Sequence, residues 1–131
     1  MKKQSGLSRV KASGGKIGGL MLSISGLKNF YFLPRFHDMR CKAPRIFEII
    51  RGRYHRDPMN GDVYIFMSKD CRKVKMIHFE NHAYYLHEKS FEEGYRFVRL
   101  EFKDGVTVYK IEWKSLVAVL ESPVVTSLQL Q

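Results

Sequence analysis

Three aspartates are the residues of this chain best suited by type to metal-assisted chemistry: Asp38, Asp57 and Asp62. Clustered carboxylates hold the metal ions of nucleases, so a two-metal site is one hypothesis for them. The alternative is structural, because Asp38 precedes a predicted helix whose N-terminus a carboxylate can cap, and the other two flank a predicted turn. We expect the structural roles and predict no catalytic residue.

Two histidines and two cysteines form a second candidate site, in the order His37, Cys41, Cys71 and His78. Four such ligands hold zinc when the fold brings them together. Their spacing matches no familiar zinc finger, and neither cysteine belongs to a Cys-x-x-Cys pair. No Gly-rich phosphate loop follows a strand either. We therefore predict no metal and no cofactor.

The basic residues carry the strongest functional signal. The net charge is +10, from 23 Lys and Arg against 13 Asp and Glu. The first sixty residues hold 13 of those bases and three of those acids. An excess placed so unevenly suits a polyanion, most often DNA or RNA, because neutralising phosphates releases counterions. The alternative is a basic surface that only aids solubility.

A helix predicted over residues 41–54 places several of these bases together. At 100° per residue, an apolar face spans about 100°. Its members are Ala43, Ile46, Phe47, Ile50 and Tyr54. Beside it, four bases fall within about 80°, and these are Lys42, Arg45, Arg53 and Arg56. We predict that this row binds phosphate, and the alternative is a solvated polar face.

Three further bases have two interpretations each. Arg40 either pairs with Asp57 or Asp62 across the helix, which is the expected outcome, or contacts phosphate. Lys75 and Lys89 lie on or next to predicted strands, where a solvated lysine is the default. Arg40 and Lys75 are kept as candidate nucleic-acid contacts. Aromatic residues offer stacking on bases as an alternative to core packing, and these are Tyr84, Tyr85, Tyr95, Phe97 and Trp113.

The elements that must position these residues follow from periodicity and turn signals. Strands are predicted over 29–33, 63–67, 73–79, 83–87, 95–102 and 106–111, with Pro44 in the first turn of the helix and a short C-terminal helix over 113–120. Loops are predicted over 68–72 and 88–94, and Asp104-Gly105 predicts a hairpin between the last two strands. The fold class is α+β, an antiparallel sheet of about five to six strands packed with one main helix. The predicted domain covers 21–122, after a flexible basic tail (1–20) and before a loose end (123–131).

Two motifs and a spaced set of residues carry a family resemblance. The motifs are Asp38-Met39-Arg40 and the stretch Arg56-Asp57-Pro58-Met59-Asn60-Gly61-Asp62-Val63-Tyr64-Ile65-Phe66. The later set is Lys75-Met76-Ile77-His78-Phe79, Leu86, Lys89, Glu92, Gly94 and Phe97. In this order and spacing the chain resembles the TnpB accessory protein of the sixty-six family of insertion sequences, from about residue 21 to 120. The resemblance implies a role in transposition beside a separate DDE-type transposase, and no catalytic activity.

Three functions follow from these observations. The first is a non-catalytic accessory protein that binds DNA, with little sequence preference, through its basic surface. The second is a module that docks on the transposase of the same element, and the third is a metal-dependent nuclease. We rank them in this order and expect no small-molecule substrate. No apolar run approaches the roughly 18 residues of a membrane span, so we also expect no membrane contact and a cytoplasmic protein.

Overall fold

A computed structural model describes residues 28–126 of the protein. The predicted tail (1–20), the predicted start of the domain at residue 21 and residues 127–131 lie outside the described residues. Within residues 28–126, neither helix is long and apolar enough to cross a membrane.

The first elements form a strand–helix–strand unit. Strand β1 is Phe30–Phe32, helix α2 is Ala43–Gly52 and strand β2 is Val63–Met67. The two strands pair in parallel, with Phe30 opposite Val63. Parallel neighbours need a long crossover connection, and α2 provides it. Both strands and the helix are confirmed, although the helix is shorter at both ends than predicted, and the parallel pair departs from the predicted antiparallel sheet.

The next strands extend the sheet in antiparallel order. Strand β3 is Lys73–Glu80 and strand β4 is Ala83–Ser90, joined at Asn81 and His82, which both have positive φ as a type I′ turn requires. All five residues of β2 are buried, which confirms the predicted central strand. Strand β4 runs three residues into the predicted loop because pairing with β3 continues to its end.

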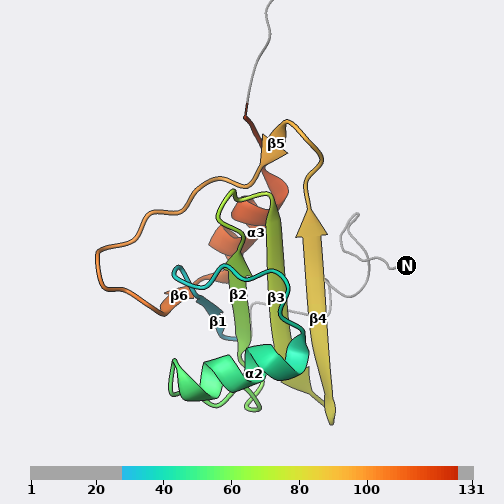
Figure 1. Cartoon of the computed structure of the whole chain (residues 1–131), viewed down its shortest axis with the longest axis vertical. Helices are drawn as coiled ribbons and strands as arrows, with labels where there is room; N and C mark the ends of the chain where they lie inside the picture. The colour runs from blue at the N-terminus through green and yellow to red at the C-terminus, as the bar shows by residue number, and fades with distance from the viewer. Residues whose placement is uncertain (1–27, 127–131) are drawn as a thin grey trace, which may run out of the picture.

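The predicted hairpin after residue 95 is wrong. The Asp104-Gly105 turn forms, with Gly105 at φ +87. Its flanks, however, join different sheets: strand β5 (Tyr95–Arg96) pairs with strand β7 (Val124–Val125), and strand β6 (Tyr109–Ile111) pairs with β1. No strand was predicted at β7. Figure 1 shows the connection between β5 and β6 swinging out to the left of the sheet.

Burial of one aromatic ring explains why the hairpin does not form. Phe97 is fully buried and packs on Phe91, with ring centroids 4.3 Å apart. Its backbone N–H donates to the carbonyl of Cys71 at 2.7 Å. This tertiary contact outweighs the local turn signal, because large apolar burial contributes more free energy than one hairpin pairing.

Within residues 28–126, the main sheet has five strands and a helix on each face, and β5 and β7 form a second, two-stranded sheet. The strand order is β4-β3-β2-β1-β6, and helix α3 (Trp113–Glu121) confirms the predicted C-terminal helix. Alternation along β2 sends Tyr64 and Phe66 to the α2 side and Val63, Ile65 and Met67 to the α3 side. Helix α2 crosses one face in Figure 1, and α3 lies behind the strands. The predicted α+β class is confirmed.

Candidate nucleic-acid interface

Helix α2 separates its apolar and basic residues as its periodicity predicts. It buries Ala43, Ile46, Phe47, Ile49 and Ile50 against the sheet, and Pro44 lies in its first turn. Its exposed side carries Arg45, Glu48 and Arg51. Lys42 is the N-cap residue and is exposed, but its side chain makes no capping hydrogen bond.

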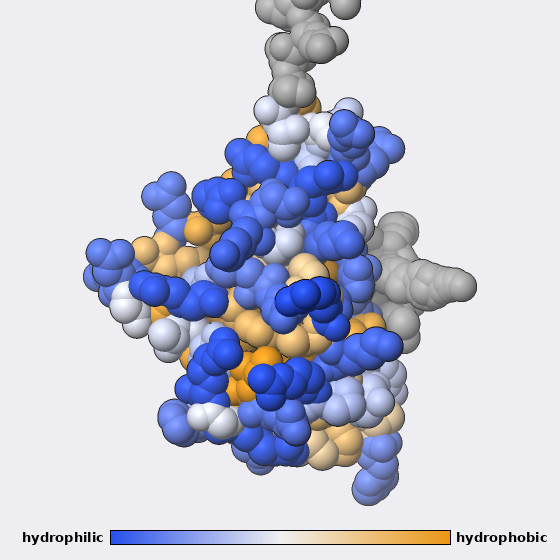
Figure 2. Space-filling model, in the orientation of Figure 1, coloured by the Kyte–Doolittle hydropathy of each residue, from blue (hydrophilic) through white to orange (hydrophobic). Residues whose placement is uncertain are grey.

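An open groove of about 700 Å³ lies beside this helix. Its walls are residues 35–41, Arg45 and Ile49 of α2, the C-cap residue Arg53 and residues 68–70. We call it the basic groove because five cations line it, and these are Arg35, Arg40, Arg45, Arg53 and Lys69. In Figure 2, hydrophilic side chains surround a smaller area of apolar surface on this side of the molecule. The structure thus brings together three predicted site residues, Arg40, Arg45 and Arg53, and two that the sequence did not indicate.

The predicted helix cap at Asp38 is wrong. Helix α2 begins five residues later, and Asp38 instead accepts the backbone N–H of Arg40 at 2.9 Å and its Nε at 3.3 Å. Hydrogen bonds from Arg40, the backbone one first, lower the pKa of Asp38. Arg40 therefore pairs with Asp38, not with Asp57 or Asp62 as predicted, while its own side chain stays 93% exposed.

The other groove cations differ in how far they are neutralised. Arg45 pairs with Glu48 of the next helical turn at 3.2 Å. Among residues 28–126, no carboxylate forms an ion pair with Arg35, Arg53 or Lys69. The guanidinium of Arg53 lies over the ring of Phe36, with its Cζ 5.8 Å from the ring centroid. These three side chains are the cations most available to an anionic ligand.

The loop that carries Lys69 is held by local hydrogen bonds. Ser68 Oγ donates to Asp70 at 2.6 Å, and the Arg72 backbone N–H donates to the same carboxylate oxygen at 3.1 Å. These bonds, led by that of Ser68, lower the pKa of Asp70. Arg99 donates to the carbonyl of Lys69 at 3.2 Å. The loop is therefore fixed at the end of the groove.

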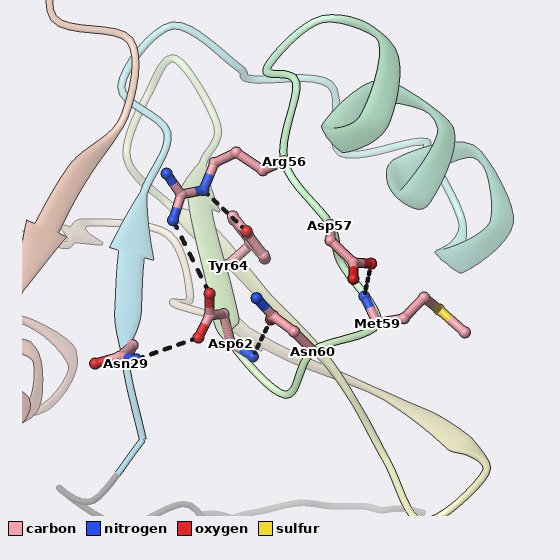
Figure 3. Close-up of polar contacts among 7 residues, drawn as sticks. All are labelled: Asn29, Arg56, Asp57, Met59, Asn60, Asp62 and Tyr64. Atoms are coloured by element: carbon pink, nitrogen blue, oxygen red, sulfur yellow. Dashed lines mark hydrogen bonds and ion pairs between the residues drawn. The ribbon is translucent and has the colours of Figure 1, made fainter.

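Arg56 does not belong to the predicted row of bases. The helix ends at Gly52, and His55 has a φ of +56, so Arg56 leaves the helical wheel on which it was placed. Figure 3 shows its side chain turned toward the start of β2. Its Nε donates to the Tyr64 hydroxyl at 3.0 Å, and its Cζ lies 4.1 Å from the centroid of the Tyr31 ring.

The same arginine meets one of the predicted turn aspartates. Arg56 Nη2 lies 3.9 Å from Asp62, which also accepts from Asn29 Nδ2 at 3.3 Å. We call Arg56, Asp62, Tyr64, Tyr31 and Asn29 the motif cluster. It joins the end of the α2 crossover to β1 and β2 (Figure 3). Its groups satisfy one another, so this part of the sequence motif stabilises the fold.

The remaining residues of this motif shape the turn, as predicted. Asp57 accepts the Met59 N–H at 2.9 Å and Asn60 accepts the Asp62 N–H at 2.9 Å. Gly61 has a φ of +94, a conformation that favours glycine. Pro58 is buried.

Three other predicted residues have structural contacts. The side chain of Lys75 is only 8% exposed, and its Nζ donates to the carbonyl of Cys41 at 3.0 Å, so it is not the solvated lysine expected. Lys89 donates to the carbonyl of Leu120, at the end of α3, at 2.7 Å. Its positive charge there complements the dipole of the helix. Gly94 has a φ of +95, and its carbonyl accepts the Thr126 N–H.

The candidate metal ligands are dispersed. Within residues 28–126, no three His, Cys, Asp or Glu side chains come together as a metal site. His37 lines the basic groove, and its Nδ1 donates to the carbonyl of Met67 at 2.9 Å. Cys71 is buried.

The candidate stacking aromatics divide between core and surface. Phe97 is buried, Trp113 stacks on Phe30, and Tyr85 stacks on His78. Tyr84 and Tyr95 are exposed, and neither lines the basic groove.

The two groove cations that sequence analysis missed, Arg35 and Lys69, lie in connections after β1 and β2. In the sequence, the one feature that could have indicated them is that each is a basic residue just after the end of a predicted strand. Parallel pairing of β1 and β2 places both strand ends at the same edge of the sheet, so these bases meet there.

Comparison with protein families assigns the chain to a family. Residues 28–129 match a protein-family model described as IS66 Orf2 like protein. No curated protein and no solved structure matches the chain.

Proposed function

Because this chain belongs to the IS66 Orf2-like family, and so has an accessory role in the transposition of an insertion sequence, we propose that it binds the phosphate backbone of DNA through the basic groove. The binding is non-catalytic and assists the separate transposase of the same element.

The observation that carries the proposal is the gathering of five cations from three chain segments around one open groove. Three of them have no ion pair with a carboxylate among the described residues. Cations without carboxylate partners repel one another, and an anionic ligand relieves that repulsion while releasing its own counterions. Phosphate oxygens fit because guanidinium groups bind them in two-pronged geometry.

The exposed face of α2 supports binding with little sequence preference. Glu48 lies in the middle of that face, between Arg45 and Arg51. A carboxylate there opposes insertion of the helix into the major groove, where most direct base reading takes place. Contacts to phosphate position a protein on DNA but carry no sequence information.

The test is the salt dependence of binding by the full chain to a random-sequence oligonucleotide, followed by fluorescence anisotropy. A groove variant, R35Q/R53Q/K69Q, removes three exposed cations. A matched control, K103Q/K110Q/K114Q, removes the same charge at exposed positions that do not line the groove. We expect the slope of log K against log salt to fall by about 2 to 3 in the groove variant and by less than about 1 in the control.

A third variant separates the groove from residues 1–20. It replaces the five bases of that segment, Lys2, Lys3, Arg9, Lys11 and Lys16, with Gln. We expect it to weaken binding but to leave the effect of the groove substitutions intact. Equal losses in the groove and control variants would mean that net charge alone drives binding. Unchanged binding in the groove variant would contradict the proposal and favour docking on the transposase.

A further inference from the structure

We infer that the basic groove takes a single nucleic-acid strand rather than a duplex, with one unstacked base lying on the guanidinium of Arg53. This inference rests on the proposed function, since it names which form of nucleic acid the same site binds.

The arrangement of the cations along the groove favours a single strand. The cations come from separate segments: Arg35 and Arg40 precede α2, Arg45 lies in the helix and Arg53 is its C-cap residue. A duplex presents its phosphates on a wide, convex surface and is normally met by protruding elements that enter its grooves. A single strand enters a concave site and runs its phosphates between two charged walls.

Arg53 provides a surface on which a base can stack. Its Cζ lies over the ring of Phe36, 5.8 Å from the ring centroid. That ring is itself 4% exposed and packs on Phe66, with centroids 4.5 Å apart, so it rests on the core. Planar guanidinium groups stack on aromatic faces, and unstacked bases in turn stack on guanidinium planes. Bases inside a duplex are already stacked and do not reach such a surface.

The motif cluster shows what a closed arrangement of the same groups looks like. The guanidinium of Arg56 also lies over an aromatic ring, that of Tyr31, but the Tyr64 hydroxyl and Asp62 occupy its polar edge. Arg53 lines an open groove and has no ion pair with a described carboxylate. Of the two arginines, only Arg53 is placed to receive a ligand.

The experiment compares a mixed-sequence single strand of about 12 nucleotides with the duplex of the same sequence, using the full chain. Arg53→Lys keeps the charge but removes the planar group. We expect it to weaken single-strand binding about tenfold and to change duplex binding less than about twofold. Arg51→Lys, in the last turn of α2 but outside the groove, is the matched control and should change neither. A single strand with abasic sites should lose its sensitivity to Arg53→Lys.

The outcomes separate the inference from the function on which it rests. If Arg53→Lys weakens both ligands equally or neither, while R35Q/R53Q/K69Q still lowers the salt slope, the single-strand inference fails and the proposed function stands. If the groove variant binds both ligands as the unsubstituted chain does, both fail. Selective loss of single-strand affinity in Arg53→Lys, absent for the abasic strand, supports both.

Discussion

The basic groove and the motif cluster contain arginines only three residues apart, yet the fold uses them in opposite ways. Arg53 caps the C-terminus of α2 and faces an open groove. Arg56 follows a left-handed residue, His55, which turns the chain toward β2 and brings the guanidinium onto Tyr31, Tyr64 and Asp62. The comparison teaches that a basic residue inside a strong sequence motif is not thereby a ligand contact. Its neighbours in three dimensions decide whether its charge is used within the fold or remains available.

The largest expected effect is on stability. Arg56→Ala should lower the free energy of unfolding by about 3 kcal/mol, because it leaves the buried carboxylate of Asp62 without its cation and removes the bond to Tyr64. Arg53→Ala should change it by less than about 0.5 kcal/mol, as expected for an exposed side chain. Urea unfolding of the two variants measures both. If both variants lowered the free energy of unfolding equally, Arg53 would be as structural as Arg56, and the contrast between the groove and the motif cluster would be wrong.

Acid should lower the free energy of unfolding through a histidine of the sheet, His78, which does not line the groove. Burial, and then the charge of Lys28, lowers the pKa of His78 to about 4, while Glu80 opposes the shift. The unfolded imidazole titrates near pH 6.5, so between these values the unfolded chain binds a proton that the folded chain does not. Titration of His78 therefore leaves the free energy of unfolding unchanged above pH 6.5. As the pH falls toward 4, it lowers the free energy of unfolding, by about 2 kcal/mol at pH 5.

Urea unfolding at pH 7 and pH 5 tests this expectation. His78→Phe keeps a flat ring in the stack with Tyr85 but cannot bind a proton, so it should lose most of that pH dependence. His55→Asn is the control, because His55 is exposed and asparagine tolerates its positive φ. The same acid loss in His78→Phe as in the unsubstituted chain would assign it to other groups.

A smaller effect is expected at Lys75, a cation enclosed by the fold as Arg56 is. Lys75→Met removes the donor to the Cys41 carbonyl and should lower the free energy of unfolding by about 1 kcal/mol. Because the ammonium is buried, the salt slope of nucleic-acid binding should not change. Anisotropy titrations at two salt concentrations check this second expectation. A lower slope would mean that Lys75 reaches phosphate, which is the alternative role predicted from the sequence.

The smallest expected effect is a gain of affinity at Asp38. Asp38→Asn keeps an oxygen to accept the Arg40 N–H but removes a negative charge from the groove. Nucleic-acid affinity should rise about threefold at low salt, and the gain should shrink as salt increases. Asp104→Asn, in an exposed turn outside the groove, should leave affinity unchanged. A gain of the same size there would show that the groove is not the binding surface.

Much of the architecture followed from local sequence patterns. The continuous apolar run predicted β2 as a central strand, and helical spacing predicted α2 and α3, because both signals arise from which side of an element is buried. The motif residues predicted the family and the turn before β2. The excess of positive charge in the first half of the chain was also evident from the sequence, because counting charges requires no knowledge of the structure.

Only the tertiary structure decided which charges meet. The sequence placed Arg56 on a helix that ends four residues earlier, and it gave no reason to associate Arg35 or Lys69 with Arg53. The hairpin signal around Gly105 was likewise overridden when Phe97 entered the core and β6 paired with β1. Periodicity reports which face of an element is buried, but not where a helix stops or which distant loops become neighbours. Those outcomes depend on strand pairing and core packing between residues far apart in the chain, and here they determine which cations remain available to a ligand.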